Sequence, residues 1–217
     1  MAKAITVKGV GKITAKPDWV VLSMTMVSLH MEYDKAMEGA EANIQSMNAS
    51  LSTVGFPDDD VKTTGFNVST NYEREKDRNG NYANVFNGYE VTHNLKLDFG
   101  FDMKRLSQAL SVISSCAAHP QVNIAFTVKD STAINEDMLR SAAENAKRTA
   151  VTLTEASGVH LGQLLAIDYN WGELDVYSHT RFGMESNCLM PMCSESINIH
   201  PDDIDVSDSA TFTWELI

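Results

Sequence analysis

The sequence predicts an α+β fold in which antiparallel-rich β-sheets carry three helices packed on one face. Runs with apolar residues at alternate positions, typical of strands, recur along the 217-residue chain. Three stretches between them have apolar residues every three or four positions, which is typical of helices. We expect a single domain over residues 1–217, or two intertwined halves of about 1–101 and 102–217 that represent a weak internal duplication.

The chain begins with a strand that we expect to break at Gly9 and Gly11, followed by a Pro17-Asp18 turn. Residues 19–29 carry apolar side chains on both faces, which predicts a central strand. A helix follows at 33–54, because its apolar residues recur at steps of four and three. These residues are Tyr33, Met37, Ala40, Ile44, Met47, Leu51 and Val54.

Residues 61–72 and 91–101 both alternate and predict a long hairpin. The segment 73–84 between them is polar, charged and contains glycine, so we expect a solvated tip that is either disordered or an interaction element. The candidate interaction surface on this tip consists of Arg74, Lys76, Arg78 and Tyr82.

Asp102 is a candidate cap for a short second helix that ends near His119-Pro120, and a strand follows at 122–128. A third helix over about 130–158 has many alanines, which permit a close approach to a sheet. Its expected inward stripe is Leu139, Ala143, Ala146, Ala150 and Leu153. Strands are expected at 164–171 and 210–216, with 172–209 irregular apart from short extended pieces near 197–199 and 204–206.

Charge and composition narrow the class of protein. The formal net charge of -12 disfavours nucleic acid as a partner, since phosphate binding requires clustered Lys and Arg.

No apolar stretch approaches the roughly 20 residues that a membrane-spanning helix needs. As written, the chain shows no signal peptide, which predicts a cytoplasmic protein; a removed signal peptide would place it in the periplasm or cell envelope. Three cysteines fit a reducing compartment better than a disulfide framework.

The sulfur-rich segment 188–193 is the sharpest chemical candidate. Thiols and thioethers are the ligands that Cu(I) and zinc prefer, and they are also readily oxidised. The candidate metal ligands are Cys188, Met190, Met192 and Cys193. The other interpretation is that the methionines pack under a loop and the cysteines are incidental, because one Cys-x4-Cys pair lacks the second ligand pair of a structural zinc site.

No motif assigns a catalytic residue or a cofactor. Gly9-x-Gly11 lacks the third glycine of a dinucleotide-binding loop and is followed by a strand. Cys116 lies near His119 but is interpreted as a small buried residue at the end of a helix. The acidic residues between 202 and 208 lack the glycine and final glutamate of a calcium loop, so we interpret them as solvated turn residues.

Several segments, in order along the chain, carry a resemblance to a known family. They are 5–11 with Pro17-Asp18, Thr63-Thr64-Gly65-Phe66-Asn67-Val68, Asn87-Gly88-Tyr89-Glu90-Val91, and the alanine-rich helix that ends at Gly158 and is followed by Leu161-Gly162. Together they resemble the SIMPL family, which includes the bacterial YggE-like oxidative-stress defence proteins. One departure is that Pro201 is followed by Asp202 where the family tends to have Pro-Gly.

The resemblance implies an α+β protein with no established enzymatic activity, linked to oxidative-stress tolerance, often exported, and in some members assembled into ring-like or channel-like oligomers. We therefore expect a non-enzymatic protein that forms a homo-oligomer and is associated with oxidative-stress defence. The alternative is a protein that handles Cu(I) or oxidants through residues 188–193. The resemblance supplies no catalytic residues.

Overall fold

The computed structural model describes residues 3–76, 81–170, 176–184 and 199–217. Within these residues it contains three α-helices, a short 3-10 turn and eight strands. The helices are α1 (Tyr33–Ser52), α2 (Met103–Ser114) and α3 (Thr132–Ala156). The strands are β1 (Ala4–Ala15), β2 (Trp19–His30), β3 (Val61–Lys76), β4 (Tyr82–Gly100), β5 (Gln121–Thr127), β6 (Leu161–Asp168), β7 (Tyr177–Met184) and β8 (Ile204–Leu216). The predicted α+β class with antiparallel-rich sheets is confirmed.

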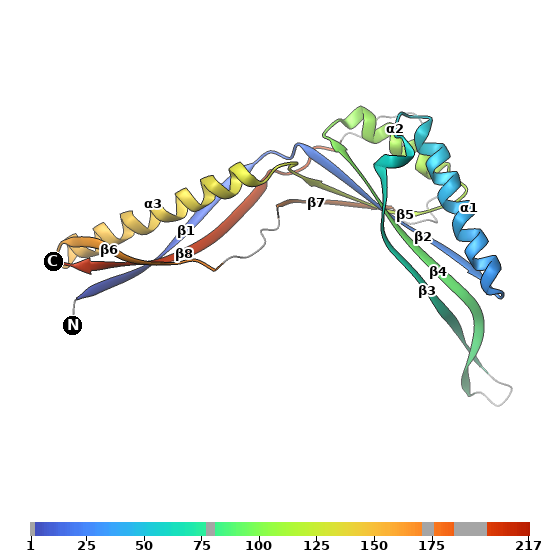
Figure 1. Ribbon diagram of the computed structural model, residues 1–217, viewed down its shortest axis with the longest axis horizontal. Coiled ribbons are helices and arrows are strands. Elements are labelled where there is room, and N and C mark those ends of the chain that lie inside the picture. The colour runs from blue at the N-terminus through green and yellow to red at the C-terminus, as the bar shows by residue number, and fades with distance from the viewer. Residues whose placement is uncertain (1–2, 77–80, 171–175, 185–198) are drawn as a thin grey trace. The chain divides into compact units, whose positions relative to one another are not determined.

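The chain forms two compact units, each assembled from segments that are far apart in the sequence. One unit consists of Met1–Asp18, Thr127–His179 and Pro201–Ile217, and the other of Trp19–Phe126 and Thr180–His200. The strands form a three-stranded sheet of order β1-β8-β6 and a five-stranded sheet of order β3-β4-β2-β5-β7. Helix α3 covers one face of the first sheet, and α1 and α2 cover one face of the second (Figure 1). The internal duplication expected from the sequence, with halves of about 1–101 and 102–217, stays a prediction.

Strand β2 lies at the centre of the five-stranded sheet, as predicted. The alternation in its sequence points Val20, Leu22 and Met24 towards the helices, where all three are fully buried. The opposite face is more open than the sequence indicated, since Val27 is 51% exposed. Helix α2 begins after Asp102, whose carboxylate accepts hydrogen bonds from the backbone N–H groups of Lys104 and Arg105, at 2.8 and 3.1 Å. The predicted cap is therefore present.

The expected break at Gly9 and Gly11 is wrong, because β1 runs through both residues and pairs with β8 along its whole length. The glycines serve the packing of α3 instead. A β-carbon on Gly9 would meet the carbonyl oxygen of Ala142, and one on Gly11 would meet that of Met138. The close approach predicted from the alanines of α3 is thus present, and it requires glycines on the strand.

The inward stripe of α3 differs from the predicted one. The buried residues are Met138, Ala142, Ala146, Ala150 and Thr154, whereas Leu153 is 49% exposed. Steps of four residues advance about 40° around a helix with 3.6 residues per turn, so this stripe winds along the helix. A winding stripe suits contact with a twisted sheet, which a straight pattern drawn from sequence does not capture.

The strands also differ from the prediction in two regions, residues 73–84 and 172–209. The expected polar tip at 73–84 is mostly strand, because β3 and β4 remain paired as far as Lys76 and Tyr82. The region expected to be irregular contains β7, and β8 is continuous from Ile204. Polar residues 207–209 hide the continuity of β8 in the sequence. Asp208 occupies one position of the alternating series, and its carboxylate accepts a hydrogen bond from the Tyr169 hydroxyl at 2.9 Å.

Candidate functional site

A two-stranded arm extends from the five-stranded sheet. The pairing of β2 with β4 ends where His30 meets Tyr89, but β3 and β4 continue to pair with one another beyond that point. We call residues 71–76 and 82–88 the β3–β4 arm, which leaves the sheet at the lower right of Figure 1. Strand β3 is also the outermost strand of its sheet. The arm therefore presents backbone edges that no described strand covers.

A β-bulge at the base of the arm determines which side chains share a face. Asn71 pairs with Gly88 and Tyr72 pairs with Phe86, so Asn87 is the extra residue on β4. Gly88 has a φ of 113°, and a β-carbon there would lie 2.5 Å from the carbonyl oxygen of His30. Because the extra residue shifts the alternation by one position, aromatic residues before and after the bulge point to the same face.

These aromatic residues form a continuous row from α1 onto the arm. The ring of Tyr33 lies 5.6 Å from that of Tyr89, which lies 5.4 Å from Phe86. Phe86 in turn lies 5.8 Å from Tyr72 on the paired strand. All three contacts have the edge-to-face geometry that aromatic rings favour. Tyr72 is nevertheless 58% exposed, so the row is an open surface and not a core.

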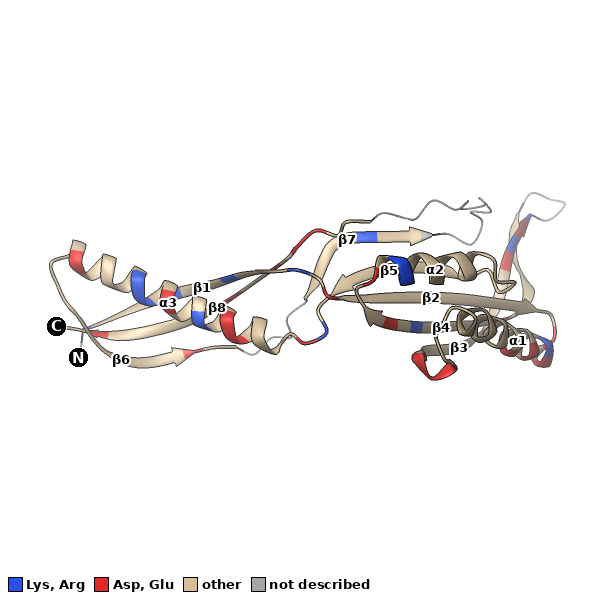
Figure 2. Cartoon of the chain, turned by 90° about the horizontal axis from the view of Figure 1, so that it is seen from above, with Lys and Arg blue, Asp and Glu red and all other residues tan. Residues whose placement is uncertain are grey.

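Two basic residues extend the same face towards the tip. The guanidinium carbon of Arg74 lies 5.1 Å from the centre of the Tyr82 ring, and Lys76 Nζ lies 6.0 Å from it. This arrangement follows from the register, since Lys76 is directly opposite Tyr82. The alternation places Glu73 and Glu75 on the other face of β3. Figure 2 shows both charge signs on this part of the chain.

The structure brings together three of the four residues proposed from sequence as an interaction surface. Arg74, Lys76 and Tyr82 are exposed neighbours on one face of the arm, while Arg78 lies outside the described residues. That these residues contact a partner stays a prediction. The sequence did not reveal that the row continues through Phe86 to Tyr33, because the bulge interrupts the alternation.

The structure gives no position for the candidate metal ligands of the sulfur-rich segment 188–193. All four of Cys188, Met190, Met192 and Cys193 lie outside the described residues. The remaining cysteine, Cys116, is 2% exposed within the core between the five-stranded sheet and helices α1 and α2. Its Sγ lies 3.3 Å from Ser46 Oγ. Its interpretation as a small buried residue is confirmed.

The acidic residues near the C-terminus take part in strand contacts. Asp205 accepts a hydrogen bond from the Thr14 hydroxyl at 2.6 Å, and the hydrogen bond to Asp208 raises the pKa of Tyr169. Both aspartates lie on β8, so their assignment to a turn is wrong. Among the described residues, no group of three or more His, Cys, Asp or Glu side chains is placed to hold a metal ion.

The outer strand of the three-stranded sheet forms a second open surface that the sequence analysis missed. Leu164, Leu165 and Ile167 on β6 are 48%, 53% and 57% exposed. The pairing of β6 with β8 has a register shift between Leu164 and Ala166, so the regular alternation of side chains is interrupted at the two leucines, and both lie open at the edge of the sheet. The adjacent pair of leucines was the available signal.

None of the helices in the described part of the chain combines the length and apolar content needed to cross a bilayer. A model of the SIMPL family, described as proteins of unknown function (DUF541), matches residues 5–214. The 26 kDa periplasmic immunogenic proteins of Brucella melitensis biotype 1 and Brucella abortus strain S19 are each 25% identical to the chain over 166 residues. Each match covers 75% of this chain and 65% of the Brucella protein.

Proposed function

The chain belongs to the SIMPL family, and on this premise we propose that it is a non-enzymatic bacterial protein that self-assembles through the β3–β4 arm. Its assembly serves oxidative-stress defence in the cell envelope. The observation that carries the proposal is the arm itself, whose aromatic face and backbone edges are both open. Tyr82 at its end is 61% exposed.

The open edges supply one component of the contact. An uncovered strand edge is a template for pairing with a strand of another chain, and main-chain hydrogen bonds then provide affinity. Many proteins block such edges with charges or a bulge. The outer strand of the arm carries charges at residues 73–76, so the edge better suited to pairing is that of β4, whose residues 82–88 are uncharged. Here the bulge lies at the base of the arm, between Asn71 and Tyr72 on β3, and the strands beyond it pair regularly to Lys76.

Charge complementarity supplies the second component. Arg74 and Lys76 place positive charge on a chain whose net charge is -12. A basic and aromatic surface on an acidic protein favours contact with an acidic surface of another copy. Tyrosine, phenylalanine and arginine are also enriched at the centres of protein interfaces.

We infer the cellular location of the chain from the names of its relatives. The Brucella proteins are named as periplasmic, which supports the periplasmic alternative for this chain. The cytoplasmic expectation gains no support from these matches.

The experiment that tests assembly is light scattering coupled to size-exclusion chromatography on the full chain. We expect a discrete mass several times 23.9 kDa. Tyr82→Ser with Arg74→Glu should reduce this mass to that of a single chain. Lys62→Glu, at an exposed position of β3 outside the arm, is the matched control and should leave the mass unchanged. A wild-type monomer, or an oligomer that the arm variant leaves intact, would contradict the proposal.

The link to oxidative stress needs a separate test. A bacterium that lacks its own copy of this gene should survive hydrogen peroxide better when it carries the wild-type chain than when it carries the assembly-deficient variant. Equal survival with both chains, at equal protein levels, would separate assembly from stress protection.

A further inference from the structure

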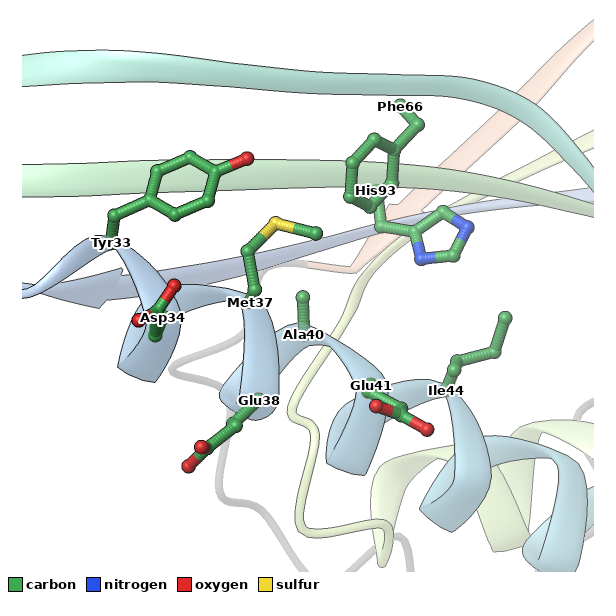
Figure 3. Close-up of a pocket in the computed structure, with 9 residues that line it drawn as sticks. All are labelled: Tyr33, Asp34, Met37, Glu38, Ala40, Glu41, Ile44, Phe66 and His93. Atoms are coloured by element: carbon green, nitrogen blue, oxygen red, sulfur yellow. The ribbon is translucent and has the colours of Figure 1, made fainter.

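A cleft of about 530 Å³ lies between α1 and the paired strands β3 and β4. Figure 3 shows Met37 and Ile44 pointing from α1 towards the strands, with Phe66 opposite them on β3. His93 also lines the cleft, but its Nδ1 is buried and offers no hydrogen bond to an occupant. The volume is within the range of about 300–1,000 Å³ that is typical of sites for molecules larger than one side chain. The cleft therefore has apolar walls and room for an aromatic side chain.

The rim of this cleft is acidic. Asp34, Glu38 and Glu41 line it from the exposed side of α1. Lys35 Nζ lies 2.7 Å from Glu38 and offsets its charge, whereas Asp34 and Glu41 form no salt bridge within the described part of the chain. These two carboxylates are seven residues apart, or about 10 Å along the helix axis. The rim therefore attracts a partner that is cationic.

The end of the β3–β4 arm carries the complementary pattern. Tyr82 is 61% exposed, and Arg74 and Lys76 approach its ring at 5.1 and 6.0 Å. Residues two apart on a strand point to the same face and are separated by about 7 Å. The flexible side chains of arginine and lysine cover the difference between this spacing and that of the two carboxylates. The arm thus presents an aromatic ring with two cations beside it.

The arm does not fill the cleft of its own chain. The pairing of β2 with β4 ends at Tyr89, and the arm continues from there past the end of the sheet (Figure 1). Tyr82 is seven residues further along β4, or roughly 20 Å of strand, and it does not line the cleft. An occupant with this pattern therefore comes from a second copy.

We propose that the cleft receives the end of the β3–β4 arm of a second copy of this chain. The Tyr82 ring of one copy packs between Met37 and Phe66 of the other, and its two cations lie against the acidic rim. The contact buries an aromatic ring and pairs opposite charges, as the centres of protein interfaces do. This inference rests on the proposed assembly through the arm and names the surface that receives it.

The contact joins two different surfaces of the chain. Two copies joined in this way keep one unused arm and one unused cleft, so further copies add head to tail. A variant that lacks a working arm still has its cleft, and a variant that lacks a working cleft still has its arm. Each variant alone should be a monomer, whereas the two together should form one contact.

The test is light scattering coupled to size-exclusion chromatography on the full chain. The arm variant is Tyr82→Ser with Arg74→Glu, and the rim variant is Asp34→Lys with Glu41→Lys. We expect the wild type to have a mass several times 23.9 kDa and each variant to have the mass of a single chain. An equal mixture of the two variants should contain a complex with the mass of two chains.

A charge control and a second cleft variant complete the set. Glu136→Lys with Glu144→Lys, at exposed positions of α3, changes the net charge as the rim variant does and should keep the wild-type mass. Met37→Trp should fill the cleft and give a single chain. Met31→Trp, at a position 59% exposed that does not line the cleft, should keep the wild-type mass. Since Met37 is only partly buried, this variant decides the matter if the rim variant fails to fold.

Three results would overturn the inference. They are a monomeric wild type, a wild-type mass in the folded rim variant and in folded Met37→Trp, and a mixture of the arm and rim variants that forms no two-chain complex. The arm variant shows which proposal has failed. If it is monomeric while both cleft variants keep the wild-type mass, assembly through the arm stands and its receiving surface lies elsewhere. If it also keeps the wild-type mass, both proposals fail.

Discussion

Gly9 on β1 lies directly against the carbonyl oxygen of Ala142 on α3, so that no β-carbon fits between strand and helix. We therefore expect Gly9→Ala to lower the free energy of unfolding by about 2–4 kcal/mol, because helix and strand must move apart. Urea denaturation measures the change. Gly183→Ala is the matched control, since a β-carbon there has nothing within 4 Å and the change should stay below about 1 kcal/mol. Equal effects at the two positions would refute the packing role of Gly9.

The cap of α2 leads to a second expectation. Asp102→Ala removes the acceptor of two backbone hydrogen bonds and should cost about 1 kcal/mol in the free energy of unfolding. Asp102→Asn keeps an oxygen acceptor and should retain most of the stability. If Asn is as destabilising as Ala, the hydrogen-bond explanation fails and the charge of Asp102 must be responsible.

His93 should make stability depend on pH. Burial lowers its pKa in the folded chain, whereas the unfolded chain has the ordinary value near 6.5. Between the two values the unfolded state binds more protons, so stability is greatest above about pH 6.5 and falls as the pH drops towards the folded-state value. Three carboxylates on α1, those of Asp34, Glu38 and Glu41, line a cleft together with His93.

The measurement is urea denaturation at intervals from pH 7.5 to 5.5 at one protein concentration. His93→Leu should flatten the slope in this range. It removes the unpartnered Nδ1 but also the hydrogen bond between Nε2 and Thr63, so we expect stability at pH 7 to fall by about 1 kcal/mol. His160→Leu should retain the wild-type slope. A wild-type slope in His93→Leu would mean that another group is responsible.

The sulfur-rich segment gives an expectation for the alternative function. If residues 188–193 bind Cu(I), anaerobic titration against a chelator should show one equivalent per chain, lost in Cys188→Ser with Cys193→Ser. Met31→Leu, which removes an exposed thioether elsewhere, should leave uptake unchanged. Equal uptake by the double-serine variant would eliminate these cysteines as ligands.

Local patterns in the sequence predicted the elements whose environment is regular. The alternation of β2, the capping role of Asp102 and the middle of the apolar series of α1 depend on residues within one element, and the structure has them. The series of α1 differs at its ends, because Tyr33 is 49% exposed and the helix stops at Ser52, before Val54. The burial of Cys116 was predicted for the same reason, because it follows the apolar face of α2.

Features that depend on a distant partner were not predictable in this way. The role of Gly9 depends on α3, which is more than 120 residues away in sequence. The buried stripe of α3 follows the twist of its sheet, so Met138 replaces Leu139. The aromatic row depends on a bulge that only the pairing of β3 with β4 reveals. His93 is one residue of an alternating strand in sequence, and its cleft exists only where α1 crosses β3 and β4.

The most direct measurement of the central claim removes the outer part of the arm, beyond the pair of Tyr72 and Phe86, and leaves its sheet intact. Tyr72 and Phe86 are paired, so Asn-Gly in place of residues 73–85 closes the hairpin with a tight turn that suits directly paired residues. Sedimentation velocity then compares this shortened chain with the wild type at equal concentration. Assembly through the arm requires that the wild type sediments as an oligomer and the shortened, folded chain as a monomer. The same number of subunits in both would contradict it.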